Sequence, residues 1–266
     1  MKNNIPAILA LGLLTGPLTA DADLVQSSTS ALATFRQCVS GETVCDSVGP
    51  TLIHSYGGLP GEPTASTSQM DPEYGASEGS VHLKGAPGAA ELSASATSLA
   101  GTRNGGNSVL LQRYTNASIS AETLTFGISL TYEQTVTAEN AGFPQEGSAH
   151  SGAVAEIAIF TMTADSLDAG MTAEENNTAL TSEPDWDSGI VELKFASTGR
   201  PTNETGSGTT EIAETVSVEA GDSIWLWAIL QSLAANGAVV NGSADTNLDS
   251  IPVAPTNADG DGHKEN

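Results

Sequence analysis

The chain has 266 residues and carries 32 Asp and Glu against 8 Lys and Arg, which gives a formal net charge of -24. A surface this acidic repels phosphate backbones and anionic lipid head groups, so we expect neither nucleic acid nor an anionic membrane as a partner. The few bases are scattered and form no basic patch, and the acidity indicates solubility in salty surroundings.

Residues 1–22 have the three-part layout of a secretory signal peptide. Lys2 gives a positive start, an apolar run covers residues 5–14, and small residues follow Gly16 and Pro17. The run is too short to span a bilayer, and no later segment is apolar for long enough. We therefore expect a secreted, extracellular protein without a membrane span, with the periplasm as the alternative location.

The only two cysteines, Cys38 and Cys45, enclose the short sequence CVSGETVC. In an oxidising compartment this spacing predicts one disulfide, and Gly41 allows the chain to reverse between the two residues. A redox or metal-binding pair is the alternative. The spacing does not fit the two-residue gap of a redox motif, and no histidine cluster lies nearby.

The first part of the mature chain gives mixed predictions. Residues 23–37 fit either a short helix or an edge strand, and residues 51–56 fit a strand. Residues 57–79 contain three prolines and many polar residues, which predicts a long loop.

From residue 80 onward, short alternating or apolar runs are separated by turn residues. Leu124, Phe126 and Ile128, for example, share one face at period two. About eight to ten strands with little helix predict an all-β fold, an antiparallel and jelly-roll-like β-sandwich. We expect a single domain over residues 23–251, followed by a flexible acidic tail over residues 252–266. The predicted strands are 81–84, 91–99, 108–114, 123–136, 153–162, 190–195, 212–219, 223–230 and one beginning at 238.

Residues 223–230 (SIWLWAIL) lie between the turn sequences Ala-Gly-Asp and Ala-Asn-Gly. Trp225 and Trp227 share one face of this predicted strand, and Leu226 lies on the other. A strand that is apolar on both faces is usually buried, so we predict that both tryptophans are core residues. An outward-facing aromatic platform that binds polysaccharide is the alternative.

Asp185, Trp186 and Asp187 are the most suggestive candidates for a ligand site. The indole could stack on a sugar ring while the carboxylates bind its hydroxyl groups, and paired carboxylates also perform glycoside hydrolysis. An acidic loop with a partly packed tryptophan is the interpretation that we favour. No nucleophile-elbow motif and no HExxH motif is present in the sequence.

Near the C-terminus, Asn257, Asp259 and Asp261 precede Gly262, as in the first half of an EF-hand-like calcium loop. The sequence then reaches Asn266 without the bidentate Glu that completes such a loop. A disordered acidic tail is the favoured interpretation, and weak calcium binding is the alternative. We expect no other cofactor.

The stretch Val218–Thr246 joins an Ala-Gly-Asp turn, an apolar strand, an Ala-Asn-Gly turn and a polar Asp-Thr segment. It resembles the closing strands of uncharacterised secreted bacterial β-sandwich proteins of the PEP-CTERM-associated kind. The resemblance implies a fold and a location, and it implies no reaction. After Ile251 the Pro-Glu-Pro motif, the apolar span and the basic end of that group are absent, so we expect no anchor of that type.

Together these features predict an exported, non-enzymatic β-sandwich that is a cell-surface or extracellular-matrix component. Its expected partner is an extracellular glycan or a surface protein. The alternative is a carbohydrate-binding or carbohydrate-active protein that uses Trp186 with Asp185 and Asp187.

The disulfide prediction has a direct chemical test. The denatured, unreduced mature protein should release no titratable thiol, because Cys38 and Cys45 are joined. Reduction before denaturation should then release two thiols per chain. Two thiols in the unreduced protein would refute the prediction.

Overall fold

The computed structural model describes residues 23–38, 45–49, 52–58, 64–84, 86, 88–136, 152–163, 190–198 and 205–252. Within these ranges the chain forms thirteen strands and no helix. The strands are β1 (Asp23–Cys38), β2 (Cys45–Ser47), β3 (Leu52–Gly58), β4 (Thr64–Asp71), β5 (Gly75–Leu83), β6 (Ala90–Ser98), β7 (Thr102–Thr115), β8 (Glu122–Val136), β9 (Gly152–Thr163), β10 (Ile190–Ser197), β11 (Thr205–Val218), β12 (Ser223–Ala235) and β13 (Ala238–Pro252).

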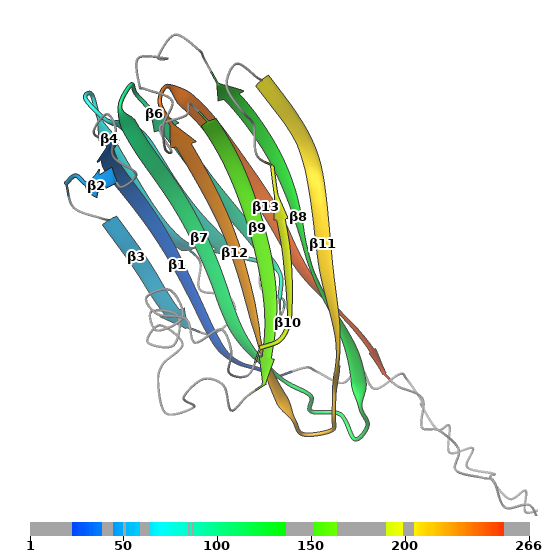
Figure 1. The fold of residues 1–266 in the computed structure, drawn as a ribbon. Helices are drawn as coiled ribbons and strands as arrows, with labels where there is room; N and C mark the ends of the chain where they lie inside the picture. Colours follow the sequence, from blue (N-terminus) through cyan, green and yellow to red (C-terminus); the bar gives the residue numbers. More distant parts are fainter. Residues whose placement is uncertain are drawn as a thin grey trace, which may run out of the picture.

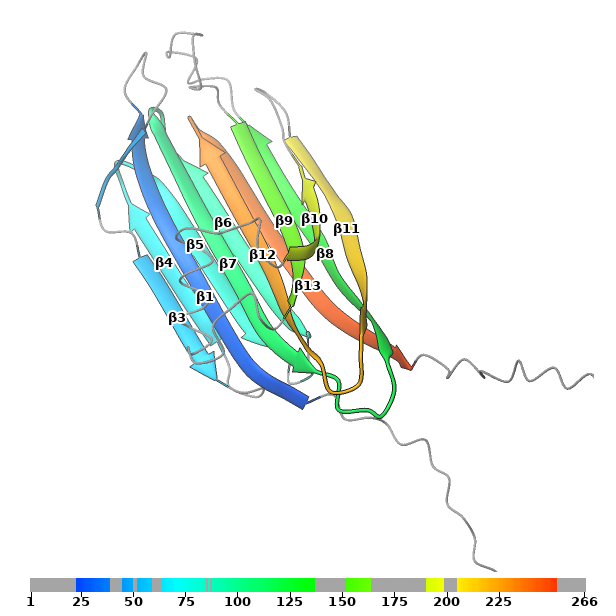
Figure 2. The ribbon, with the colours of Figure 1, turned by 60° about the horizontal axis from the view of Figure 1, so that its bottom comes forward.

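The strands form two antiparallel sheets that pack face to face (Figure 1, Figure 2). Sheet A has seven strands in the order β10-β9-β12-β7-β1-β2, with β3 also paired to β1. Sheet B has six strands in the order β11-β8-β13-β6-β5-β4. The prediction of an all-β antiparallel sandwich is confirmed, with more strands than the eight to ten expected.

The chain passes repeatedly from one sheet to the other, so most neighbours within a sheet are distant in sequence. The passage from β12 to β13 is a two-residue turn in which Asn236 and Gly237 have φ angles of 52° and 82°. The connection from β11 to β12 also turns at a positive φ, 82° at Gly221. Glycine and asparagine adopt this left-handed region at low cost, which explains why both predicted turn sequences reverse the chain.

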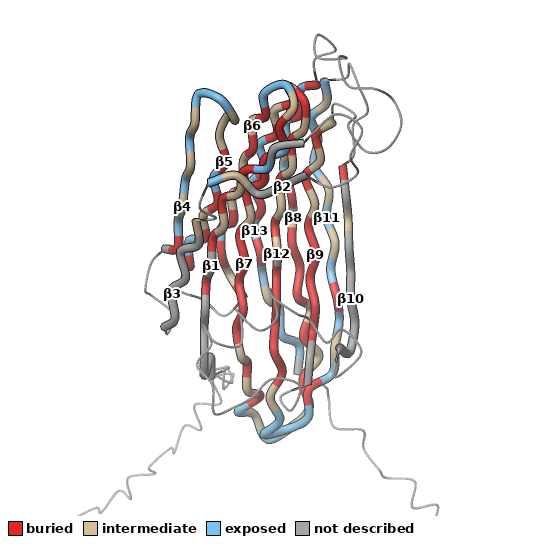
Figure 3. The backbone as a smooth tube through the Cα atoms, turned by 60° about the vertical axis from the view of Figure 1, so that its left-hand side comes forward, coloured by how far each residue is buried: buried red, intermediate tan, exposed pale blue. Residues whose placement is uncertain are grey.

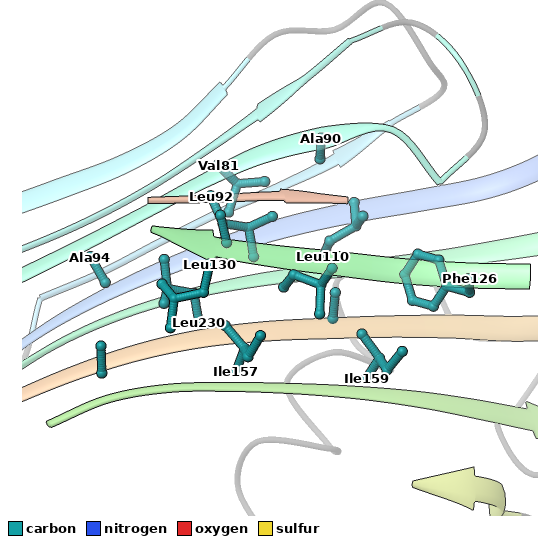
Figure 4. Close-up of a cluster of buried hydrophobic side chains, with 14 of the residues drawn as sticks. Val81, Ala90, Leu92, Ala94, Leu110, Phe126, Leu130, Ile157, Ile159 and Leu230 are labelled. Atoms are coloured by element: carbon teal, nitrogen blue, oxygen red, sulfur yellow. The ribbon is translucent and has the colours of Figure 1, made fainter. Parts of the chain in front are cut away.

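The main hydrophobic core lies between the sheets where β8 and β13 face β9 and β12 (Figure 4). Alternate residues along each strand supply it, as the period-two pattern of β8 predicted. Large aliphatic and aromatic side chains fill this side of the sandwich. They include Leu124, Phe126, Ile128, Leu130, Ile157, Ile159, Leu226 and Leu230, none of which is more than 1% exposed.

On the other side, where β7 faces β5 and β6, the two backbones touch. A Cβ atom built at Gly106 would lie 1.9 Å from the Glu78 carbonyl oxygen, and one at Gly79 would lie 2.2 Å from the Asn107 carbonyl oxygen. Packed sheets are usually about 10 Å apart, with side chains between them. Glycine at both positions therefore permits a local approach that any other residue would block.

Polar side chains bridge the sheets at this narrow side. Asn104 Nδ2 donates hydrogen bonds to the carbonyl oxygens of Tyr74 (2.7 Å) and Thr97 (2.5 Å). Ser108 Oγ accepts a hydrogen bond from the Ser80 backbone amide at 3.0 Å. Both Asn104 and Ser108 are completely buried, so the bonds satisfy the Asn104 amide nitrogen and the Ser108 hydroxyl group, which have lost contact with water.

The loop predicted over residues 57–79 was wrong, because most of it forms the hairpin β4–β5. Between residues 64 and 79 these strands carry mostly small residues, with Ala65 and Ser77 buried, and the large buried apolar residues Val81 and Leu83 come only at the end of β5. The close approach of the backbones at Gly79 and Gly106 explains this composition, since only small side chains fit beside these contacts. Pro72 lies in the turn that follows Asp71, where it interrupts no ladder.

The segment that fitted a helix or an edge strand is β1. It lies inside sheet A, with β7 on one side and β2 and β3 on the other. Its alternate residues Ala31, Ala33 and Phe35 are buried. Burial at every second residue is the pattern of a strand, so the helical alternative is excluded.

The backbone contact at Gly106 predicts that adding one methyl group at this position strongly lowers the free energy of unfolding. Gly106→Ala should lower the free energy of unfolding by about 1–3 kcal/mol, because the sheets must separate to admit the Cβ atom. Gly208→Ala on β11 is the control, since the nearest atoms to its Cβ belong to the side chain of Tyr132, with the hydroxyl oxygen at 3.0 Å, and none is a backbone atom. Urea unfolding followed by circular dichroism measures both, and equal losses would contradict the close approach.

Candidate interaction surfaces

The two candidate sites predicted from sequence cannot be placed in the fold. Asp185, Trp186 and Asp187 lie outside the described residues, as do Asn257, Asp259 and Asp261. Both sites therefore remain predictions. Within the described ranges, no group of three or more His, Cys, Asp or Glu side chains is arranged to hold a metal ion.

The backbone around the cysteines is compatible with the predicted disulfide. In the ladder between β1 and β2, residue Cys38 lies directly opposite Cys45. Opposed residues of an antiparallel pair have Cα atoms about 4.5–5.5 Å apart, within the range that a disulfide spans. The two side chains lie outside the described part of the structure, so the bond itself stays a prediction.

Trp225 and Trp227 are buried, with exposed fractions of 0% and 2%, which confirms the prediction that they are core residues. They do not face the main core, however. They point away from sheet B and pack on the outer face of sheet A with Phe160, whose ring stacks on Trp227 at a centroid distance of 4.4 Å. The alternative of an exposed aromatic platform is thus wrong for this pair.

The outer face of sheet B is polar and exposed, in contrast to β7, β9 and β12, which are coloured mostly as buried in Figure 3. A line of six hydroxyl residues crosses this face, one from every strand, and we call it the hydroxyl row. Ser80 Oγ and Ser93 Oγ within it are hydrogen-bonded at 2.7 Å. The row consists of Thr209, Thr131, Ser243, Ser93, Ser80 and Ser66.

The neighbouring line of residues carries charge. Lys84 Nζ lies 2.9 Å from Glu91 Oε1 and 2.6 Å from Asp245 Oδ1, so one ammonium group bridges β6 and β13. Its hydrogen bonds to Asp245 and Glu91 raise the pKa of Lys84. These groups are exposed, and a surface ion pair of this kind adds little stability. The described part of this face is hydroxyl-rich and acidic.

Strand β11 is an edge strand of sheet B among the described residues. Among the described strands it pairs only with β8, through a ladder of 14 residues without a register shift. It contains no proline, lysine or arginine, the residues that commonly protect an edge. Its two charges are Glu211, which is exposed, and Glu214, which points inward and is 7% exposed.

A buried acid–phenol pair closes one end of the sandwich. Tyr114 Oη donates a hydrogen bond to Glu122 Oε2 at 2.7 Å, and the two residues are 0% and 3% exposed. Burial, followed by the bond to the Glu122 carboxylate, raises the pKa of Tyr114 well above its usual range. Because both groups are enclosed, the pair joins β7 to β8 and offers no reactive atom to a solute.

No family model and no curated protein matches the chain. Among solved structures, the enzymatically active domain of tailspike protein 4 from bacteriophage CBA120 aligns with 73% of this chain and 18% of its own, at 11% identity and a TM-score of 0.22. A chain from the structure of the infectious bursal disease virus Gx strain aligns with 88% of this chain and 57% of its own length, at 11% identity and a TM-score of 0.22.

A further structure, the T13 particle of infectious bursal disease virus, aligns with 87% of this chain and 64% of its own, at 12% identity and a TM-score of 0.17. The chain spans less than two thirds of the length of each of these proteins. Scores this low transfer neither a family nor a function. The described residues also contain no helix long and apolar enough to cross a membrane.

The buried acid–phenol pair predicts a pH dependence. The folded state holds the Tyr114 proton, whereas the unfolded chain releases it near pH 10, so stability is complete below about pH 10 and falls above it. Tyr114→Phe should lower the unfolding free energy at neutral pH by about 1–3 kcal/mol, since Glu122 loses its donor, and should weaken the alkaline loss. Tyr132→Phe is the control, which should keep both the unfolding free energy at neutral pH and the loss of stability at alkaline pH. Urea unfolding at neutral pH and at about pH 11 measures the difference, and identical alkaline losses in both variants would count against the pair.

Proposed function

We propose that this chain is an exported, non-enzymatic component of the cell surface or extracellular matrix, and that it assembles by pairing the open edge of sheet B with a second copy. The observation that carries the proposal is β11, a 14-residue strand that pairs on one side only among the described strands. The signal-peptide layout of residues 1–22 and the resemblance of Val218–Thr246 to secreted bacterial β-sandwich proteins support the location.

A free edge presents a row of backbone amide and carbonyl groups that hydrogen-bond readily to another strand. Proteins that avoid such pairing usually place Lys, Pro, a bulge or an inward charge on the edge. β11 has one of these devices, the inward Glu214, which lies in its C-terminal half. The part from Thr205 to Ala213 has none.

The outer face of sheet B suits an assembled layer. Thr209 is the end of the hydroxyl row on β11, so two copies paired edge to edge through an antiparallel β11 ladder would form one continuous polar sheet. Such a layer exposes hydroxyl and carboxylate groups and stays hydrated. The net charge of -24 opposes assembly by self-repulsion, so we expect assembly to strengthen as salt screens the charge.

The test is a pair of matched lysine variants. Thr209→Lys places a charge on the open edge, and Thr131→Lys places the same charge on the same line of the sheet but on the interior strand β8. Light scattering across a range of concentrations and salt should show assembly of the wild type and of Thr131→Lys. Thr209→Lys should remain monomeric or need at least about tenfold more protein, a difference of 1.4 kcal/mol.

A wild-type chain that stays monomeric under all of these conditions would contradict the proposal. A monomer that binds a glycan, with binding lost in Trp186→Ala, would instead establish the carbohydrate-binding alternative with Asp185 and Asp187. Equal assembly of the two lysine variants would mean that the contact lies elsewhere than β11.

A further inference from the structure

Sheet B has a second edge strand, β4, at the opposite end of the sheet from β11 (Figure 2). Among the described strands β4 pairs only with β5, through an eight-residue ladder without a register shift. In an antiparallel edge strand, alternate residues point their amide and carbonyl groups away from the one partner. Within the described part of the chain, β4 therefore presents a row of unpaired backbone donors and acceptors.

The sequence of β4 contains none of the residues that commonly protect an edge. Thr64–Asp71 (TASTSQMD) has no proline, lysine or arginine, and its one charge, Asp71, is its last residue. Its ladder with β5 also has no bulge that would twist the edge away from a partner. The edge strand β10 of sheet A differs, since it contains Lys194 and has a register shift in its ladder with β9.

The β4 edge is held in place by the body of the sandwich. Strands β1 and β3 of sheet A pack against β4, and Ala65 on its inner side is 0% exposed. An edge strand that is already ordered loses little conformational entropy when another strand pairs with it. The edge is therefore prepared for a partner.

The outward side chains of β4 suit contact with a second copy. Ser66 and Ser68 are exposed and uncharged, so a second β4 brings no like charges together here, although the net charge of the chain is -24. Met70 lies on the same face and is 85% exposed. A strand paired to this edge would cover part of the Met70 side chain and so remove apolar surface from water.

A contact between two β4 strands would continue the assembly proposed for β11, on which this inference rests. Pairing through β11 alone is a two-fold contact in which each copy uses the same strand, so it closes at a dimer. In that dimer the continuous sheet would have β4 at both of its ends. A two-fold axis normal to the sheet makes the β4 strands of neighbouring dimers antiparallel and keeps their polar outer faces on one side.

We propose that β4 is a second self-association edge, which pairs with β4 of another β11-linked dimer and extends the dimers into a linear ribbon. The partner at this edge is a further copy of the same chain. The ladder available on β4 has eight residues, against 14 on β11, so the β4 contact is the weaker of the two. It forms second, at higher protein concentration or at higher salt, where the negative charge is screened.

The test uses two lysine variants on one line of sheet B. Ser68→Lys places a charge on the β4 edge, and Asn241→Lys places the same charge on the interior strand β13. Both positions are exposed. Each new lysine lies directly opposite a glutamate, Glu78 on β5 or Glu133 on β8, so the two surroundings are matched.

Sedimentation velocity over a range of protein and salt concentrations separates monomers, dimers and larger species. The wild type and Asn241→Lys should pass from dimers to larger species whose mass rises with concentration. Ser68→Lys should stop at the dimer, or should need at least about tenfold more protein to grow beyond it, a difference of 1.4 kcal/mol.

Oxidation of Met70 by hydrogen peroxide, measured by mass spectrometry of peptides, follows the same contact and also works in the unaltered chain. The oxidation rate should fall roughly twofold between the dilute and the assembled wild type, because oxidation follows exposure and a second β4 covers one side of Met70. In Ser68→Lys the rate should not change with protein concentration. A constant rate in wild-type protein that has grown beyond the dimer would overturn the proposal.

The outcomes separate this inference from the assembly proposed for β11. A wild type that stops at a dimer, with the dimer lost in Thr209→Lys, would overturn the β4 contact and leave the β11 contact standing. Dimers that are lost in Ser68→Lys and kept in Thr209→Lys would support the β4 edge and overturn the β11 contact. Equal growth of Ser68→Lys and Asn241→Lys into larger species would overturn the β4 contact.

Discussion

The fold depends on removing both faces of β12 from water. One face of this strand places Ile224, Leu226 and Leu230 in the main core. The other face places Trp225 and Trp227 in a second hydrophobic cluster with Phe160, on the face of sheet A that points away from sheet B. Two buried faces require two covering layers, since a β-strand presents its side chains alternately to each side. Sheet B is one layer, and among the described residues no strand supplies the other.

This arrangement determines which surfaces remain for interaction. The centre of sheet A is buried, so among the described residues the outer face of sheet B is the main exposed face. Contact of the backbones at Gly79 and Gly106 draws β5 and β6 against β7, which favours small residues on that side. The outcome is a polar sheet with one long open edge at β11, and the proposed assembly follows from that edge.

The sequence was sufficient to predict the strands that carry large apolar residues, such as β8 and β12, and to predict the burial of Trp225. It was insufficient for β4 and the first part of β5, because their small residues fit a strand only where the two backbones come close. The hydroxyl row could not be predicted from the sequence either, since only the register of six strands aligns Thr209 with Ser66. The buried Tyr114–Glu122 pair gave no local pattern, because a tyrosine and an acid near each other in sequence are common.

Native-state hydrogen exchange of the dilute, low-salt protein tests the central claim most directly, because it compares β12 and β11 within one molecule. We expect the β12 amides from Trp225 to Leu230 to exchange only through global unfolding, as befits a strand buried on both faces. Amides of β11 between Thr205 and Ala213 should exchange through local opening, at least about a hundredfold faster, which corresponds to roughly 2.8 kcal/mol. Protection of β12 no greater than that of β11 would contradict the account.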